Sequence, residues 1–136
     1  MRLRGRIWRS AVVGAAATAM SIMGMATASA SLDGPYVETP NGCASAWFQA
    51  NGDKFWIGDW CADSASGAAL WRVNLPCGPM GRTCPDRHLY NSKGSGTGHG
   101  VSINWTEDVP ITYRACVVDR SASKVKTCSA YRGAVT

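Results

Sequence analysis

The sequence predicts an all-β fold, a small antiparallel β-sandwich or open barrel of seven or eight strands held by three disulfides. Three observations predict it. Short runs rich in β-branched and aromatic residues alternate with clusters of Gly, Pro, Asn, Asp and Ser, as in sandwiches and barrels. No long stretch repeats apolar residues at helical spacing. The chain also has six cysteines, and an even number in a small exported domain is typical of a disulfide framework.

The expected strands are short and separated by turn clusters. They are Tyr36 to Thr39, Ala44 to Ala50, Lys54 to Cys61, Ala69 to Leu75, His88 to Asn91, Val101 to Trp105, Ile111 to Asp119 and Val125 to Tyr131. Pro76 to Pro85 is expected to be a loop, and Gly94 to Gly100 a flexible one, because Gly and Pro interrupt regular structure.

Residues 1–30 have the three parts of a secretory signal peptide. Four arginines come first, then an uncharged stretch from Ala11 to Met25, then the small-residue cleavage pattern Ala28-Ser29-Ala30. The alternative is a membrane anchor, but a bilayer span needs about 20 strongly apolar residues, and this stretch is diluted with Ala, Gly, Ser and Thr. We expect cleavage after Ala30, which makes residues 31–136 a single secreted, extracellular domain.

Removal of the leader changes what the net charge implies. The whole chain has 14 basic and 9 acidic residues, a net charge of +5, but four of the basic residues and none of the acidic ones lie in the leader. The remainder has a net charge of +1. The sequence therefore gives no reason to expect a nucleic acid as partner, or a membrane once the leader is cleaved.

Strand register predicts the disulfide pairing. If Asn51-Gly52-Asp53 forms a hairpin loop, Cys43 faces Cys61, and Phe48 faces Trp56. If Ser121-Ala122-Ser123 forms the later turn, Cys116 faces Cys128. Opposed Cβ atoms on paired strands lie about 4.5 to 5.5 Å apart, close to disulfide geometry. Cys77 and Cys84 remain, and their bridge would close a Pro/Gly-rich loop.

No metal or cofactor is expected. Zinc is disfavoured because there is no C-x-x-C spacing and the histidines are only His88 and His99. Asp59 and Asp63, with the turn that follows them, supply too few oxygen ligands for calcium.

An aromatic strip is the candidate binding site. Trp56 and Trp60 lie four residues apart on one expected strand, hence on one face and about 13 Å apart, with Phe48 opposite Trp56. Among Ala and Gly neighbours, these rings would form a flat platform suited to stacking on sugar faces. The alternative is that this face packs under the second sheet as core.

Alternation assigns the faces of the last hairpin. Its odd positions are apolar and expected to face the core: Ile111, Tyr113, Ala115, Val117, Val125 and Tyr131. The outer face carries the Cys116–Cys128 bridge and the even positions Thr112, Arg114, Lys126 and Arg132. Arg114, Lys126 and Arg132 could form a basic stripe for an acidic polymer, although charges on a solvent face are ordinary.

Catalysis has little support in the sequence. The polar residues that could serve follow no recognisable spacing, and there is no G-x-S-x-G motif; these residues are Arg82, Arg87, His88, His99, Glu107 and Asp108. No catalytic residue is therefore assigned, and a small secreted hydrolase or nuclease stays an alternative. A second alternative is a protease inhibitor that presents the loop from Cys77 to Cys84, because a short bridged loop is preorganised for binding.

Three segments carry a resemblance to a known group. They are Gly52-Asp53-Lys54-Phe55-Trp56-Ile57-Gly58-Asp59 with Ala62-Asp63 after it, Tyr90-Asn91-Ser92-Lys93-Gly94-Ser95-Gly96-Thr97, and Tyr113-Arg114-Ala115-Cys116 with Thr127-Cys128-Ser129-Ala130-Tyr131. Together they resemble a group of short secreted actinobacterial hypothetical proteins. The resemblance implies export, a bacterial host and a disulfide-bonded, β-sandwich-like domain, and it brings no activity. Ser64, Cys61 and Cys77 depart from the pattern of the group.

The sequence thus favours a non-catalytic extracellular binding or interaction domain. Its expected partner is an extracellular polysaccharide, such as a cell-wall glycan, or a protein.

Overall fold

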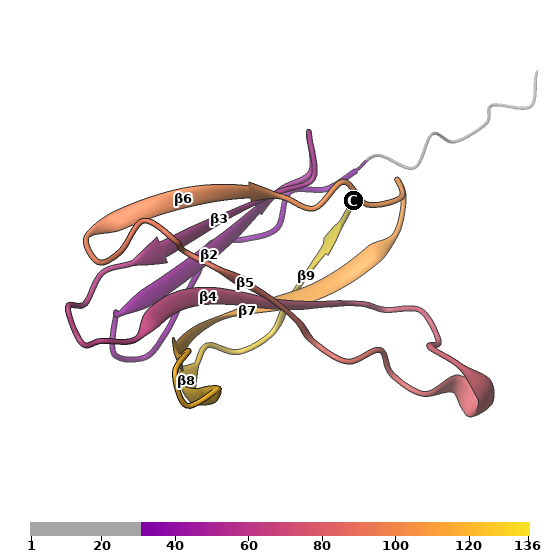
Figure 1. The fold of residues 1–136 in the computed structure, drawn as a ribbon. Coiled ribbons are helices and arrows are strands. Elements are labelled where there is room, and N and C mark those ends of the chain that lie inside the picture. The colour runs from indigo at the N-terminus through magenta and orange to yellow at the C-terminus, as the bar shows by residue number, and fades with distance from the viewer. Residues whose placement is uncertain (1–30) are drawn as a thin grey trace, which may run out of the picture.

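The computed structural model describes residues 31–136; the predicted signal peptide lies outside this range. The described chain is an all-β sandwich, which confirms the predicted fold class (Figure 1). Its strands are β1 (Val37–Glu38), β2 (Ala44–Gln49), β3 (Lys54–Asp59), β4 (Ser66–Val73), β5 (Arg87–Tyr90), β6 (Thr97–Ser102), β7 (Pro110–Asp119), β8 (Lys124–Cys128) and β9 (Arg132–Val135). A short 3-10 turn, η1 (Pro79–Gly81), lies in the protruding loop after β4.

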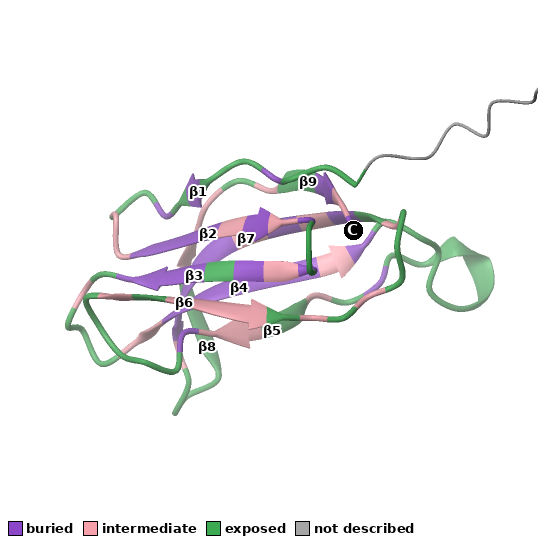
Figure 2. Cartoon of the chain, turned by 90° about the horizontal axis from the view of Figure 1, so that it is seen from above, coloured by how far each residue is buried: buried purple, intermediate pink, exposed green. Residues whose placement is uncertain are grey.

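The strands form two antiparallel sheets. The first sheet has the order β1-β2-β3-β6, and the second has the order β5-β4-β7-β8, with β9 also paired to β7. β8 pairs with the second half of β7 and β9 with the first half, so the two short strands follow one another along the same edge of β7. The two sheets pack face to face, and Figure 2 shows the buried residues concentrated in their central strands.

The core lies between the sheets and is rich in aromatic side chains. Phe55 of the first sheet is central, with ring centroids 4.9 Å from Phe48, 5.3 Å from Tyr113 and 6.0 Å from Trp71. Such tilted and edge-on contacts stabilise the fold beyond the burial of apolar area alone. The Tyr113 hydroxyl donates a hydrogen bond to the carbonyl of Pro35, and burial raises the pKa of Tyr113 to about 12.

All three predicted disulfides form: Cys43–Cys61, Cys77–Cys84 and Cys116–Cys128. No described cysteine is free. The predicted pairings rest on strand register and elimination, and the structure confirms all three pairings. Between residues 31 and 136, no helix is long and apolar enough to cross a membrane.

The register of the first hairpin differs from the predicted one by one residue. Phe48 lies opposite Phe55, not opposite Trp56, and Trp47 lies opposite Trp56. The reason is the turn, which spans four residues between Gln49 and Lys54 instead of the three predicted. A shift of one residue moves the side chains of one strand to the other face. The Cys43–Cys61 bridge still forms because both residues lie just beyond the ladder, where the Trp60 amide donates to the Cys43 carbonyl.

The last hairpin departs from simple alternation. Cys116 faces Cys128 as predicted, but a β-bulge between Val117 and Val118 shifts the register beyond that pair. Val125, which was predicted to face the core, is consequently 38% exposed. Tyr131, also predicted to face the core, lies instead in the chain segment that connects β8 to β9. The outer face around Cys116 is itself covered, forming a second small cluster of buried side chains: Ala68, Leu70, Cys116 and Val118.

The sixth strand begins earlier than predicted. β6 includes Thr97 to Gly100, which the sequence places in a flexible loop, and it ends at Ser102 instead of Trp105. Asn91 explains the early start, because its buried side-chain amide donates to the carbonyls of Ile57 and Thr97 at 3.1 and 2.7 Å. The loop is therefore tied to β3, and its glycines enter the sheet.

Candidate functional site: an aromatic groove

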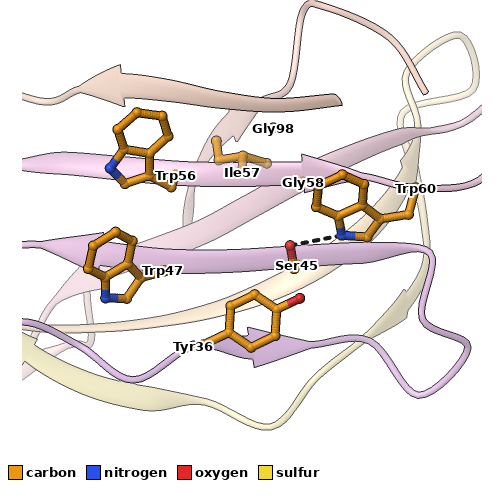
Figure 3. A pocket seen from close by; sticks show the side chains of 8 residues that line it. All are labelled: Tyr36, Ser45, Trp47, Trp56, Ile57, Gly58, Trp60 and Gly98. Atoms are coloured by element: carbon orange, nitrogen blue, oxygen red, sulfur yellow. Dashed lines mark hydrogen bonds between the residues drawn. The ribbon is translucent and has the colours of Figure 1, made fainter. Parts of the chain in front are cut away.

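The outer face of the first sheet carries an apolar groove of about 390 Å³ (Figure 3). We call it the aromatic groove, and it is lined by Tyr36, Ser45, Trp47, Trp56, Ile57, Gly58, Trp60 and Gly98. Four of these residues are aromatic, and they come from β2, β3 and the segments beside β1 and β3.

Trp47 and Trp56 form one wall. They are directly opposed on β2 and β3, and their rings lie side by side at one end of the view in Figure 3. The Trp56 indole N–H donates to the Gln49 side-chain oxygen at 3.1 Å, which fixes the plane of the ring. The Lys54 ammonium lies 5.5 Å from the centroid of the same ring. Trp56 is therefore held by two neighbours that are not part of the groove.

Trp60 forms the opposite wall. It follows the end of β3, and its indole folds back over Gly58, where its N–H donates to the Ser45 hydroxyl at 3.0 Å. A Cβ atom at Gly58 would overlap both the indole and that hydroxyl. The disulfide from Cys61 to Cys43 and the backbone hydrogen bond from Trp60 to Cys43 anchor this segment. The wall therefore depends on a glycine under it and a disulfide beside it.

The sheet surface beneath the Trp60 indole, which we call the floor of the groove, carries almost no other side chains. Ser45, Gly58 and Gly98 follow one another across β2, β3 and β6, and Gly58 pairs with both of the others. Tyr36 borders the floor at the β1 side, where its hydroxyl donates to Glu38. The apolar walls thus enclose a shallow channel that crosses the strands.

The structure separates the three predicted binding residues. Trp56 and Trp60 both line the groove, with 40% and 45% of their surface exposed, so this face does not pack under the second sheet. Phe48 is fully buried on the opposite face, in the core, because of the one-residue change in register.

Sequence reasoning missed Trp47 and Tyr36 as members of the groove. A signal was present for Trp47. Ala44, Ala46, Phe48 and Ala50 are apolar at every second position, whereas Ser45 and Gln49 are polar. This alternation places Trp47 on the polar, outward face together with Ser45 and Gln49.

The predicted basic stripe on the second sheet is partly neutralised. Arg114 and Arg72 both approach the carboxylate of Asp86 at 3.4 Å, and their guanidinium groups lie 4.4 and 4.5 Å from the ring centroid of Tyr131. The Tyr131 hydroxyl donates to Asp86 at 2.6 Å, and burial together with this carboxylate raises the pKa of Tyr131. Lys126 and Arg132 are exposed.

The other polar candidates do not converge on one site. His88 lies on β5 in the second sheet and His99 on β6 in the first. Asp59 is buried, where burial raises the pKa of its carboxyl, and Asp63 accepts a hydrogen bond from the Ala65 amide at 3.0 Å within its own turn. Among the described residues, no group of three or more His, Cys, Asp and Glu could hold a metal ion.

The loop closed by Cys77 and Cys84 projects from one end of the sandwich (Figure 1). Met80 at its tip is 94% exposed and has a φ of 69°, in the left-handed region. The backbone turns at Met80, whereas Arg82 two residues later is extended, with φ −61° and ψ 139°.

The chain matches no protein-family model, no curated protein and no solved structure. Its function must therefore be argued from the aromatic groove itself.

Proposed function

We propose that this protein is a secreted, non-catalytic binding domain that holds a neutral carbohydrate chain in the aromatic groove. One observation carries the proposal: the outer face of an otherwise ordinary sandwich leaves three tryptophans and a tyrosine around an open apolar channel. Large exposed apolar patches on soluble domains are uncommon and commonly mark interaction sites.

The fixed orientation of the rings favours stacking as the mode of binding. The indole N–H groups of Trp56 and Trp60 are already used by Gln49 and Ser45, so the rings present their faces and not their donors to a ligand. The C–H faces of pyranose rings stack on such aromatic faces. The hydroxyls at the sugar edges would then meet the polar groups at the rim, which include Glu38 and Gln49.

A neutral ligand is favoured over a cationic one. Aromatic side chains around a pocket also bind quaternary ammonium groups through cation–π attraction. In this groove the Lys54 ammonium already lies over Trp56. A second cation against the same ring would be repelled by that charge, whereas a sugar ring would not.

Three disulfides fit an exported protein, and secretion is part of the proposal. The proposed secretion also rests on the predicted signal peptide. Mass spectrometry of the protein recovered from the culture medium tests it, and we expect a first residue of Ser31 and no free thiols. A first residue far from Ser31 would argue against cleavage after Ala30.

Titration with glycans tests the binding site. We expect soluble cellulose, chitin or cell-wall fragments to change the tryptophan fluorescence of the domain, and the corresponding insoluble polymer to retain it. Trp56→Ala and Trp60→Ala should each abolish both signals. Met80→Ala removes a more exposed apolar side chain far from the groove and serves as the control. If no glycan changes the fluorescence, the carbohydrate proposal is wrong.

The inhibitor and hydrolase alternatives stay predictions. The inhibitor alternative predicts that the protein blocks one protease in a panel and that the Arg82→Ala variant does not block it. The second expects turnover of RNA or glycans that disappears in His88→Ala or His99→Ala. We base the proposal on the groove because its side chains converge, whereas those of the alternatives do not.

A further inference from the structure

The aromatic groove runs across the strands and not along them. Its floor passes from Ser45 on β2 over Gly58 on β3 to Gly98 on β6. The Trp60 indole lies over this floor, and Trp56 stands to one side of it (Figure 3). Neighbouring strands lie about 4.8 Å apart, so the four strands from β1 to β6 span about 14 Å.

The two ends of the groove differ. At the β1 end, the ring of Tyr36 borders the channel. At the other end β6 is the edge strand of the sheet, and its outward-facing residue in the floor is Gly98, which has no side chain. The channel is therefore open over the edge of β6.

The fold does not require glycine at position 98. A Cβ there would have Trp60 at 3.8 Å as its nearest neighbour, an ordinary contact, and the backbone is not in the left-handed region. Gly58 differs because Trp60 covers it, and Gly100 differs because a Cβ there would lie 3.1 Å from Lys54 and 3.4 Å from Trp56. Packing thus explains why residues 58 and 100 are glycines. Packing does not explain the glycine at position 98, but this glycine keeps the end of the groove open.

We infer that Gly98 determines the length of ligand that the groove accepts, by letting a linear glycan extend past Trp60 and over the edge of β6. This inference rests on the proposed function and deepens it. It implies that the domain binds a stretch of a longer polysaccharide and not a lone mono- or disaccharide. A side chain at position 98 would close the exit while leaving the walls intact.

The experiment measures affinity against chain length. Cello- and chito-oligosaccharides from disaccharide to hexasaccharide are titrated into the wild-type domain and into Gly98→Leu, with folding checked by thermal unfolding. Gly98→Gln, whose side chain is longer but flexible and polar, serves as a second variant if the leucine impairs folding. Ser102→Leu adds the same bulk two positions beyond Gly100, on the same exposed face of β6 but outside the groove, and is the matched control.

We expect the wild-type affinity for one of the two series to rise at least tenfold between disaccharide and tetrasaccharide. Gly98→Leu and Gly98→Gln should remove that rise, and Ser102→Leu should keep it. If the position-98 variants bind the hexasaccharide as tightly as wild type while Trp56→Ala does not, the inference is wrong and the proposed function stands. If wild type binds no oligosaccharide and no insoluble polymer, the proposed function fails and the inference with it.

Discussion

The outer faces of the two sheets both carry aromatic rings, but they use them in different ways. On the second sheet, the guanidinium groups of Arg72 and Arg114 lie 4.5 and 4.4 Å from the ring centroid of Tyr131, and its hydroxyl donates to Asp86. On the first sheet, the N–H groups of Trp56 and Trp60 are also used within the molecule and Lys54 lies over the Trp56 ring, yet the two residues are 40% and 45% exposed. The two faces therefore differ less in whether the rings have partners than in how much of the rings stays exposed, and the proposed binding site rests on that exposed area.

The largest expected effect is on glycan binding, and it distinguishes the outer faces of the two sheets. Trp60→Ala should weaken glycan binding at least tenfold, because it removes one wall of the groove and such central aromatic side chains dominate binding energies. Tyr131→Ala should leave the affinity unchanged. Isothermal titration of both variants with the same oligosaccharide measures this. Equal losses of affinity in the two variants would contradict the difference between the two faces.

A second prediction concerns the glycine under the tryptophan. Gly58→Ala should displace the Trp60 indole, lower the free energy of unfolding by about 1 to 3 kcal/mol through overpacking, and weaken binding as Trp60→Ala does. Gly133→Ala on the second sheet is the control, because a Cβ there would meet only the Ile111 carbonyl at 3.8 Å. Denaturant unfolding measures both variants. An unchanged stability in Gly58→Ala would show that Trp60 can move away freely.

A third prediction concerns the tyrosine between the sheets. The pKa of Tyr113 is about 12 in the folded protein against an ordinary value of 10.0. The unfolded chain therefore loses this proton first, so the stabilisation is complete below pH 10 and is lost as the pH rises through 12, a change of about 2 to 3 kcal/mol. Tyr113→Phe should remove this dependence, although it also removes the hydrogen bond to Pro35. Unfolding followed by circular dichroism at several alkaline pH values measures it, and an equal alkaline loss in the variant would contradict it.

A smaller effect is expected from the carboxylate on the second sheet. Asp86→Ala leaves Arg72 and Arg114 without their shared partner, and because these groups are partly exposed we expect a loss of about 1 kcal/mol. The loss should shrink at high salt, which screens the interaction. Glycan binding should not change. A loss of binding in this variant would mean that the two faces are coupled.

The smallest effect is expected at the turn between β7 and β8. The Asp119 carboxylate accepts hydrogen bonds from the Ser121 hydroxyl and from the amides of Ser121 and Ala122, and these bonds lower its pKa. Its stabilisation is therefore present above pH 3.8 and lost as the pH falls through the lowered pKa. Asp119→Asn should lower the melting temperature slightly at neutral pH, and the two proteins should converge in acid. A constant difference at every pH would exclude the charge as the cause.

The sandwich and its disulfides were predictable because their signals are local. Alternation in single strands and the spacing of Cys43, Cys61, Cys116 and Cys128 around two turns contain that information. The composition of the groove was predicted wrongly at one position, because the turn before Lys54 has one residue more than predicted and this exchanges Phe48 for Trp47 on the outer face. The alternation of residues 44–50 contained the signal that places Trp47 there. The position of Tyr131 depends on a bulge and a strand break that arise from pairing with β7. The exposure of Trp56 depends on which face the second sheet covers, and the strand that contains Trp56 does not encode this.

The disulfide beside Trp60 links the groove to the redox state of its surroundings. Cys61 follows Trp60 directly, and its bond to Cys43 closes the end of the hairpin on which that wall stands. In a reducing cytosol this end of the hairpin would have only hydrogen bonds, the Trp60 amide to Cys43 and the indole to Ser45, and the indole would no longer be anchored next to a crosslink. Under the proposed function, the domain would therefore reach its full affinity for sugar only after oxidation, and a reducing agent should weaken binding before it unfolds the sandwich.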